Sequence, residues 1–452
     1  MLQLKLAMFA QLPYPGKMIP GVFVTCADDI LIFDSAVCDF TSPGFTALAH
    51  RSPLVTAAGH GVFALPGEGV AMGPADAFIH KPSESRMREK GLVRTTEHPD
   101  GSTEEWAYTD SAFFFDRGVS KKLLTFWDDG LGGNLGCEID CYGDFLQPLG
   151  PAADDSYLAK TTSNIVAGAG GDDSELVRIR KALWELLRGT ALSVMPLHPS
   201  RFYHIGTFAE YLHFFARDKT FGLEVVTQTE INVKRRGGGE PVPEAGAEAA
   251  DVPPPTILLN CDAAASSIVG VGSVVEFSVL GANAIVGCDC LLSGADLAAG
   301  SRVPDGTFLQ TWALTDGTSS DVVEYVAHVI ATTDDIKKVL TEGGTIQWLG
   351  CSVADACATL GVSLDAVWVE PSKPKNLWEA RLFPIGATAA EATSRAVAML
   401  AAVRGDADAA GDLSWLKEGG AQLQSLSVSL GLSSAEVQTK LRSQMSRELA
   451  QL

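Results

Sequence analysis

Two neighbouring carboxylates follow a short apolar segment near the start of the chain. Asp28 and Asp29 follow one residue after Gly21–Cys26, a stretch whose composition is typical of a buried strand. In open parallel sheets, ligands bind at the carboxyl ends of the strands. Carboxylates at such a place can hold Mg²⁺, which prefers oxygen ligands and usually shares them with substrate phosphates. An acidic turn or a helix cap would explain the same pattern, so the pair alone does not identify a metal site.

A lysine stands before a proline in the segment IHKPSES, residues 79–85. Proline disfavours helical backbone at the residue before it, so we expect Lys81 to be extended and the direction of its side chain to be restricted. An ammonium group held in this way could bind a sugar phosphate as a point charge. A surface lysine is the simpler interpretation of the dipeptide.

More carboxylates cluster in the middle of the first half of the chain. Asp110 precedes the apolar segment Ser111–Phe115, and Glu138, Asp140 and Asp144 crowd a short acidic stretch. Clustered carboxylates suit the hydroxyl groups of a sugar or a metal ion. They suit helix caps and solvated loops equally well.

A histidine ends a predicted strand in the segment SRFYHIGTFAEYL, residues 200–212. The strand reaches Gly206 and Thr207, where a helix is predicted to begin. His204 could act as a ligand or an acid–base group, although a histidine beside aromatic residues is often structural. The chain has no GxSxG, HExxH or GxxxxGK[ST] motif, which argues against hydrolase and P-loop kinase chemistry.

Strand and helix patterns alternate over residues 1–233, which predicts an α/β domain with a mainly parallel sheet. The clearest helix is Ser174–Arg188, which Gly189 would terminate. One face of this helix is apolar, with Leu176, Ile179, Leu183 and Leu187. Residues 234–256 are rich in glycine, proline, alanine and acidic residues and predict a linker.

A six-residue repeat follows the predicted linker. Its aliphatic residues are Ile268, Val274, Leu280, Val286 and Leu292, and small residues stand mostly four positions after them. This period is typical of a parallel β-helix in which the aliphatic side chains point inward, so we predict a parallel β-helix over residues 257–312. Repeat stacks are structural by default, so this segment is expected to be a scaffold or an oligomer surface.

The last part, residues 313–452, is predicted to be a mixed, partly helical segment. A helix is expected over Ser433–Leu452, with a capping box formed by Ser433 and Glu436. Its apolar stripe would pack on the body of the protein or on a second copy. The stripe consists of Val437, Leu441, Met445, Leu449 and Leu452.

Composition limits the partners and the compartment. The 452 residues include 34 basic and 55 acidic side chains, which gives a net charge of −21 and argues against nucleic-acid and anionic-membrane partners. The nine cysteines form no CxxC pair, and no apolar run reaches the ~18 residues that a membrane span needs. The N-terminus lacks the features of a signal peptide. We therefore expect a cytoplasmic protein with reduced thiols.

The motifs taken together carry a resemblance that none carries alone. The order and wording of ten strings resemble the fucose-1-phosphate guanylyltransferase (GDP-fucose pyrophosphorylase) family. The strings are LKLAMF, PGVFVTCADDI, SPGFTALAH, GHGVF, HKPS, YTDSAFFFD, CEIDCYGDFLQPLG, RFYHIGTFAEYL, SVVEFSVLG and LWEARLFP. That family also supplies the N-terminal part of bifunctional fucokinase proteins. The likeness runs from about residue 2 to residue 400 and rests on long, distinctive strings.

The resemblance implies a nucleotidyltransferase-like (Rossmann-like) α/β domain followed by a β-helix. It implies that GTP and L-fucose-1-phosphate are the substrates, that GDP-L-fucose and pyrophosphate are the products, and that Mg²⁺ is the cofactor. Asp28 resembles the aspartate that binds the metal, Lys81 resembles the lysine that contacts the sugar phosphate, and Glu138 resembles the glutamate that contacts sugar hydroxyls.

The segment FYHIGT resembles a Trp-x-Asp-x-Gly-Thr motif whose aspartate is a second metal ligand. Gly206 and Thr207 match that motif and are expected at the substrate, but His204 stands where the aspartate should be. Imidazole is a poor ligand for Mg²⁺. We therefore expect Asp110 or Asp140 to supply the missing carboxylate, unless one metal ion suffices.

The family also has a Gly-rich loop that cradles the nucleotide triphosphate, and no such loop precedes Asp28. The α/β domain is therefore expected to be truncated at its N-terminus. Two alternatives to an active enzyme follow: the N-terminal part of a bifunctional protein, or a catalytically dead partner that binds sugar phosphate. A homo-oligomer could form through the β-helix or the C-terminal helix.

Overall fold

The computed structural model divides into two compact units, Met1–Gly206 and Thr207–Leu452, and each is described by itself. It describes residues 12, 16–26, 28–34, 37–67, 72–135, 137, 139–159, 173–225, 229–236, 255–316, 321–368, 370, 373–406, 411–418, 422–433 and 435–451. The expected domain boundary at residue 233 lies inside the second unit, because helix α7 (Phe208–Ala216) contributes Leu212 and Ala216 to the core of that unit. Of the predicted linker 234–256, Lys234–Arg236 form strand β12 and residues 237–254 lie outside the described residues.

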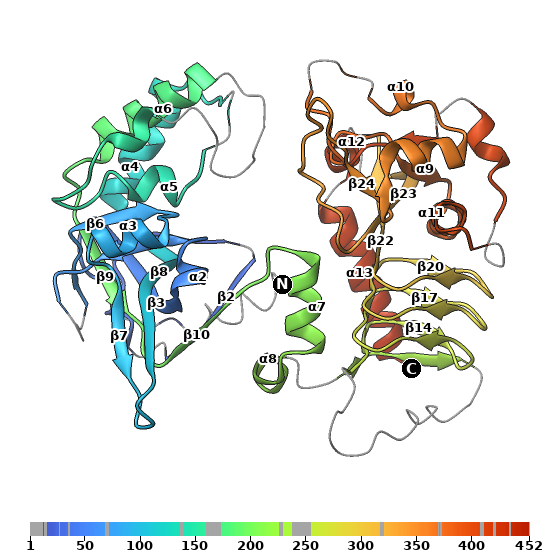
Figure 1. Ribbon diagram of the computed structural model, residues 1–452, viewed down its shortest axis with the longest axis horizontal. Helices are drawn as coiled ribbons and strands as arrows, with labels where there is room; N and C mark the ends of the chain where they lie inside the picture. Colours follow the sequence, from blue (N-terminus) through green and yellow to red (C-terminus); the bar gives the residue numbers. More distant parts are fainter. Residues whose placement is uncertain are drawn as a thin grey trace. The chain divides into compact units, whose positions relative to one another are not determined.

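The first unit is built on one eight-stranded sheet (Figure 1). Its main path is β5–β9–β3–β8–β4–β6, and β1 and β7 also pair with β8. The strands are β1 (Gly21–Thr25), β3 (Phe45–Pro53), β4 (Gly61–Ala64), β5 (Gly73–Pro74), β6 (Ala77–His80), β7 (Arg94–Glu97), β8 (Thr103–Asp116) and β9 (Leu192–Pro196). Phenylalanine rings on β3 and β8 pack together in its core, with Phe45 5.4 Å from Phe115 and 5.9 Å from Phe113 between ring centroids.

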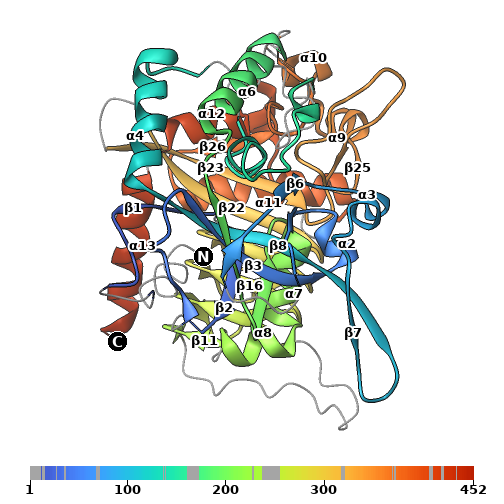
Figure 2. The same cartoon turned by 90° about the vertical axis from the view of Figure 1, so that its left-hand side faces the viewer.

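The prediction of a mainly parallel sheet is wrong. Among the described pairings of this sheet only β3·β9 is parallel, and β8 pairs antiparallel with β1, β3, β4 and β7. A parallel crossover needs a dozen or more residues. The connections β3–β4 and β7–β8 are much shorter than that, since β3 ends at Pro53, β4 begins at Gly61, β7 ends at Glu97 and β8 begins at Thr103. The long β7–β8 hairpin extends away from the sheet in Figure 2.

Helices of the first unit cover this sheet and its edge. They are α2 (Leu54–Ala57), α3 (Glu84–Glu89), α4 (Arg117–Thr125), α5 (Gly143–Leu146) and α6 (Asp173–Leu187), with a π-helical turn at Phe126–Gly130 and a 3₁₀ turn at Ser156–Ala159. The predicted helix over Ser174–Arg188 is confirmed as α6, and its four predicted core leucine and isoleucine side chains are buried. Arg180 of α6 donates through Nε to Asp144 Oδ1 of α5 at 2.8 Å, and both side chains are buried.

A separate two-stranded ladder carries much of the site described below. Strand β2 (Asp29–Phe33) pairs antiparallel with β10 (Ser200–His204), which places Asp29 opposite His204. The predicted strands Gly21–Cys26 and Arg201–Ile205 thus correspond to β1 and β10, but β1 is a half-exposed edge strand rather than a buried one.

Three stacks of parallel strands follow helices α7 and α8 (Lys219–Glu224) in the second unit (Figure 1). The first contains β11 (Glu230–Ile231), β13 (Ile257–Leu259), β16 (Val274–Glu276), β19 (Leu291–Ser293) and β22 (Thr307–Thr315). The second contains β12, β14 (Asp262–Ala264), β17 (Val279–Leu280) and β20 (Asp296–Leu297), and the third contains β15 (Ile268–Val269), β18 (Ile285–Val286) and β21 (Arg302–Val303).

From β13, β14 and β15 onward, each stack repeats every 17 residues, as in Leu258↔Val275, Val275↔Leu292 and Leu292↔Leu309. Three regular steps of six would give 18, so one step in each coil is five. The mostly buried positions that recur with steps of five, six and six are Leu258, Ala263, Val269, Val275, Leu280, Val286, Leu292, Leu297, Val303 and Leu309.

This shorter step corrects one predicted core residue. Val274, Leu280, Val286 and Leu292 are buried as expected, but Ile268 is 59% exposed. Because a coil has 17 residues rather than 18, the inward position lies one residue away from where a strict six-residue period puts it. Val269, not Ile268, therefore pairs with buried Val286.

Antiparallel strands and helices complete the second unit. Strands β23 (Val322–Ala331), β26 (Phe383–Gly386) and β27 (Leu423–Gln424) continue the sheet from β22, and β24 (Gln347–Trp348) pairs with β25 (Cys351–Ser352). The helices are α7, α8 (Lys219–Glu224), α9 (Val353–Leu360), α10 (Leu364–Val367), α11 (Ala389–Arg404), α12 (Leu426–Leu432) and α13 (Ala435–Ala450), with a 3₁₀ turn at Ser414–Glu418.

The predicted C-terminal helix is confirmed as α13, which packs on the second unit itself. Val437 is buried, Gln438 donates to the carbonyl of Ala313 at 2.8 Å, and Arg442 donates to Ser293 Oγ at 2.9 Å. The structure shows no reciprocal capping box among the described residues, since Ser433 Oγ donates to the carbonyl of Leu430 instead.

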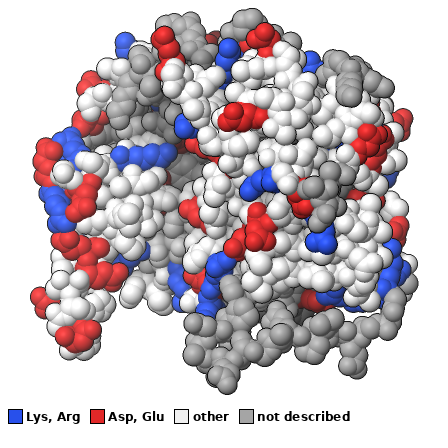
Figure 3. All heavy atoms as spheres, turned by 45° about the vertical axis from the view of Figure 1, so that its right-hand side comes forward, with Lys and Arg blue, Asp and Glu red and all other residues white. Residues whose placement is uncertain are grey.

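No described helix is both long and apolar enough to cross a membrane. On the face that Figure 3 shows, lysine and arginine side chains are scattered among acidic ones rather than gathered into one large patch. The expectation that nucleic acid is not a partner stays a prediction.

The assignment of inward positions with steps of five, six and six residues can be tested by a pair of substitutions. Leu280→Ala should lower the free energy of unfolding by about 2–5 kcal/mol, because it leaves a cavity between stacked coils. Ile268→Ala in the same repeat should change it by no more than about 0.5 kcal/mol, because that side chain faces solvent. Urea unfolding followed by circular dichroism would measure both. Equal destabilisation by the two variants would contradict the assigned phase.

Candidate functional site

The end of the β2·β10 ladder brings Asp28, Asp29 and His204 together. His204 Nδ1 lies 2.9 Å from Asp29 Oδ1, and the backbone N–H of Ile205 donates to the carbonyl of Asp28 at 2.8 Å. Asp29 is buried, whereas the His204 side chain is 38% exposed. The ladder therefore fixes two neighbouring carboxylates, one of them buried, and orients the buried one through a histidine.

A second histidine joins this group to the main sheet. The ring of His60 stands edge-on to the ring of His204, with centroids 5.1 Å apart, and its Nδ1 lies 3.9 Å from Asp110 Oδ1. Burial lowers the pKa of His60, and Asp29 opposes this while Lys81 adds to it. The neutral imidazole thus lies within electrostatic reach of both carboxylates and of the lysine.

Asp110 is a buried carboxylate at the centre of the group. Its Oδ1 accepts a hydrogen bond from the backbone N–H of Gly61 at 3.0 Å. Burial raises the pKa of Asp110 well above its usual value, and the charges of Asp29 and Asp140 raise it further while Lys81 lowers it. Three carboxylates therefore crowd together, two of them buried, and the exposed Lys81 lies within electrostatic reach of Asp110.

Glycine is required beside Asp110. A Cβ on Gly61 would lie 2.7 Å from Asp110 Oδ2 and 1.9 Å from the Phe78 ring. Any side chain at residue 61 would displace the carboxylate or the ring. The GHG segment therefore places His60 while leaving room for Asp110.

The segment that contains Lys81 lies against this group. The backbone N–H of Lys81 donates to the carbonyl of His60 at 3.0 Å, and His80 Nε2 lies 3.3 Å from Asp140 Oδ2. The expected extended backbone at Lys81 is wrong, because its φ is +46°, in the left-handed region that non-glycine residues rarely adopt. The bond to His60 and the turn into Ser83, the N-cap of α3, hold this costly conformation.

A buried tyrosine ties three segments of the site together. Tyr142 donates through its hydroxyl to the carbonyl of Ser111 at 3.1 Å and accepts from the backbone N–H of Cys26 at 3.2 Å. Burial raises the pKa of Tyr142 well above its usual value, so the hydroxyl remains a donor at neutral pH. The turn between β1 and β2, strand β8 and the acidic segment around Asp140 thereby keep a fixed arrangement.

One group of side chains has the spacing of a metal site. Ligand atoms of Cys26, Asp28 and Asp29 lie within 4.8 Å of one another. Burial raises the pKa of the Cys26 thiol to about 12, with Asp29 adding to the shift, so sulfur stays protonated and is a poor ligand. The two carboxylates remain as oxygen ligands, a donor type that fits Mg²⁺.

Most of the residues that the sequence singled out meet here. Asp28, Lys81, Asp110, Asp140 and His204 belong to this one group, which we call the carboxylate cluster together with Asp29 and His60. Glu138 lies outside the described residues.

Gly206 and Thr207 have clear local roles at the end of this segment. A Cβ on Gly206 would lie 2.5 Å from His204 Nε2, so glycine leaves space for that ring. Thr207 belongs to the second unit and caps α7 by accepting from the N–H of Glu210 at 3.1 Å. Contacts of either residue with substrate stay a prediction.

The sequence did not single out His60, His80 or Tyr142 as site residues. A signal existed for His60, since a histidine between two glycines, GHG, has unusual backbone freedom on both sides. No comparable local signal marks Tyr142, whose partners are 31 and 116 residues away.

A pocket of about 560 Å³ opens beside the cluster within the first unit. Lys81, Arg86 and Lys90 give it positive charge, and Asp76 and Asp154 give it acceptors. The remaining lining is Ala64, Ala77, Phe78, Ile79, His80, Pro82, Ser83, Leu92, Gln147, Ala152, Ser156 and Tyr157. A pocket with an apolar wall and polar groups of both signs suits a small phosphorylated molecule with hydroxyl groups.

The site therefore combines a carboxylate pair that suits a divalent cation with a lysine at the edge of a polar pocket, an arrangement typical of enzymes that handle phosphorylated substrates. Residues 1–388 match the family model of the fucose pyrophosphorylase domain. The human fucose-1-phosphate guanylyltransferase is 32% identical over 433 residues, which cover 89% of this chain and 67% of that protein. The mouse protein of the same name is 34% identical over 430 residues, which cover 89% of this chain and 69% of that protein. The chain belongs to the fucose pyrophosphorylase family.

Because the carboxylates are crowded, we predict that removing the charge of one of them stabilises the folded protein, by an amount that depends on pH. Because the pKa of Asp110 is raised in the folded state, the unfolded chain binds fewer protons there, and this group costs stability as the pH rises above its ordinary value. Asp110→Asn keeps an acceptor for Gly61 and should raise the melting temperature at pH 8 by a few degrees, since about 1 kcal/mol corresponds to roughly 2–4 °C.

The gain should shrink as the pH falls towards 4 and in the presence of Mg²⁺. Exposed Asp128→Asn is the matched control and should show no such trend in calorimetry. A gain from Asp110→Asn that stayed constant over this pH range would argue against a buried, charged Asp110.

Proposed function

We propose that this chain is an enzyme that joins L-fucose-1-phosphate to a guanine nucleotide, forming GDP-L-fucose and pyrophosphate from GTP. The observation that carries the proposal is the match to the fucose pyrophosphorylase domain over residues 1–388, because this region includes the whole carboxylate cluster, and the fucose-1-phosphate guanylyltransferases that match over 89% of the chain support it. The cluster and its neighbouring pocket offer the charges that such a reaction needs.

In the proposed reaction, an oxygen of the sugar phosphate attacks the α-phosphorus of GTP. The new bond joins that oxygen to phosphorus, the bond to the bridging oxygen of the β-phosphate breaks, and pyrophosphate leaves with the electron pair. The sugar phosphate is already an anion, so no proton must be removed from the nucleophile. The task of the protein is to align two anions and to offset their charge.

The residues of the first unit divide this task. Asp28 and Asp29 would hold Mg²⁺, and His204 orients Asp29 through the 2.9 Å contact. Mg²⁺, when bound, supplies positive charge that offsets the phosphate oxygens. Lys81 binds the phosphate of the sugar at the mouth of the pocket, where its backbone conformation limits the direction of its side chain.

The pocket would hold the sugar itself. Its polar side chains, among them Asp76 and Gln147, can accept or donate to hydroxyl groups. Ala77, Ile79 and Leu92 form an apolar part of the lining, which suits the methyl group of a 6-deoxy sugar. GTP would bring its α-phosphate to the carboxylate cluster.

We also propose that residues 257–312 form a parallel β-helix that serves as a scaffold. The three parallel stacks and their 17-residue register support this proposal, because a chain that visits three sheets in turn must wind as a coil.

The central experiment is a synthesis assay. The chain, incubated with GTP, L-fucose-1-phosphate and Mg²⁺, should form GDP-L-fucose and pyrophosphate, both detectable by chromatography. Lys81→Ala should lower kcat/KM by about 10²–10³-fold, because a charge that stabilises the transferring phosphates is lost. Lys121→Ala, an exposed lysine of α4, should leave it unchanged. Absence of product from a correctly folded chain would refute the activity and favour a sugar-phosphate-binding partner.

A titration can test whether Asp110 or Asp140 adds a further carboxylate to the metal site of Asp28 and Asp29. Asp110→Ala or Asp140→Ala should raise the Mg²⁺ concentration for half-maximal activity by about 10–100-fold, as expected when a group that holds or supports a metal is lost. Asp129→Ala, which changes an exposed residue of the π-helical turn Phe126–Gly130, serves as the control. If the Mg²⁺ dependence of both cluster variants matched that of the parent, neither Asp110 nor Asp140 would hold or support the metal.

A further inference from the structure

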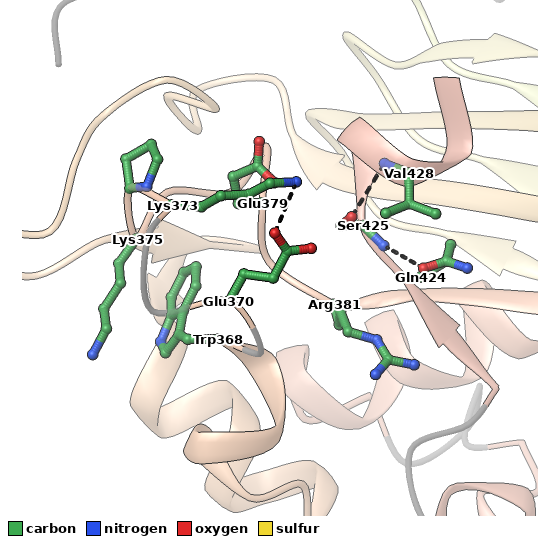
Figure 4. A pocket seen from close by; sticks show the side chains of 10 residues that line it. Trp368, Glu370, Lys373, Lys375, Glu379, Arg381, Gln424, Ser425 and Val428 are labelled. Atoms are coloured by element: carbon green, nitrogen blue, oxygen red, sulfur yellow. Dashed lines mark hydrogen bonds and ion pairs between the residues drawn. The ribbon is translucent and has the colours of Figure 1, made fainter. Parts of the chain in front are cut away.

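A second pocket, of about 200 Å³, lies within the second unit, where the function proposed above uses no residue (Figure 4). The side chains that matter for the argument are Trp368, Glu370, Lys373, Glu379, Arg381 and Gln424. Two of them, Glu379 and Arg381, come from LWEARLFP, one of the strings that carry the family resemblance.

Backbone contacts hold the walls of this pocket in place. The N–H of Arg381 donates to the carbonyl of Val367, next to Trp368, at 3.1 Å. Arg381 Nε donates to the carbonyl of Leu423 at 3.2 Å, and Gln424 follows on strand β27. The three segments that supply the lining are therefore joined by hydrogen bonds rather than by side-chain packing alone.

The carboxylates of the pocket are paired with a lysine. Lys373 Nζ lies 3.1 Å from Glu379 Oε2 and 3.6 Å from Glu370 Oε2, and Figure 4 shows its ammonium group beside both carboxylates. Ser427 Oγ donates to Glu379 Oε2 at 2.7 Å. Each carboxylate offers two oxygens with about four acceptor positions, so acceptor capacity remains on both.

We propose that this pocket binds one hexose-sized sugar ring. The half-buried indole of Trp368 offers a flat apolar face for the C–H groups of the ring. Sugar hydroxyls both donate and accept, and the lining supplies acceptors from Glu370, donors from Arg381 and an amide from Gln424 that does both.

The size and charge of the pocket select this ligand over others. A volume of about 200 Å³ is below the ~300–1,000 Å³ of pockets that take drug-sized molecules, so a dinucleotide or an oligosaccharide would not fit. A bare anion would meet Glu370 and Glu379 at close range. The ligand can be a free hexose or a hexose phosphate, because Lys375 and Arg381 also line the pocket and could pair with a phosphate.

Saturation-transfer NMR on the full chain tests the proposal with L-fucose, D-mannose, their 1-phosphates and inorganic phosphate as probes. At least one sugar should receive saturation at its ring protons. Trp368→Ala should weaken its binding at least about tenfold, which corresponds to about 1.4 kcal/mol. Trp415→Ala, a tryptophan of the same unit outside this pocket, should leave binding unchanged. Binding of the free sugars, or binding of the sugar 1-phosphates only, supports the site and tells which of the two sources supplies its ligand.

The Lys81→Ala background separates this site from the one in the first unit. Binding that depends on Trp368 should persist there, even if the chain forms no GDP-fucose, so the two proposals can fail independently. Gln424→Ala provides a second test if Trp368→Ala does not fold. The proposal is overturned if no probe binds, if Trp368→Ala and Gln424→Ala both bind the sugar as the parent does, or if inorganic phosphate displaces the sugar as effectively as the sugar phosphate does.

Discussion

Repulsion between buried carboxylates is the constraint around which the first unit is arranged. Asp29 and Asp110 are both buried, and Asp140 contributes to the raised pKa of Asp110. Like charges in a weakly solvated region raise each other's energy unless cations or hydrogen-bond donors offset them. The cluster meets this need with His204 on Asp29, the Gly61 N–H on Asp110 and His80 beside Asp140.

Several local features make sense as consequences of that arrangement. Gly61 is small because Asp110 and Phe78 occupy the space of a side chain, and Lys81 takes a left-handed backbone that brings its N–H to His60. Both features cost conformational freedom or strain. A sheet selected for stability alone would avoid them, so their presence beside three carboxylates fits a site that is organised in advance for cationic and phosphorylated ligands.

The parts that the sequence predicted well are those set by local periodicity. Helix α6 and the stacked strands follow from the spacing of apolar residues, because burial on one face imposes that spacing. Ile268 shows the limit: a six-residue period cannot reveal that one step of each coil is five, since only the stacking of successive coils sets the 17-residue register. The prediction of parallel strands failed for a similar reason. An alternation of strand and helix patterns does not show whether each connection is long enough to return the chain for a parallel pairing.

The structure brings together several residues that the sequence singled out, but the sequence did not predict how they are connected. Asp28, Asp110 and Lys81 were chosen one by one, yet what joins them is His60 and Tyr142, whose contacts span large sequence separations. The backbone of Lys81 illustrates why: the local rule for a residue before proline favours extended φ, and a tertiary hydrogen bond to His60 overrides it. Local rules identify residues that are capable of chemistry, whereas the fold determines which of them lie close enough to influence one another electrostatically. His204, a poor Mg²⁺ ligand by its chemistry, is therefore better understood as the group that orients Asp29 than as a substitute for a missing carboxylate.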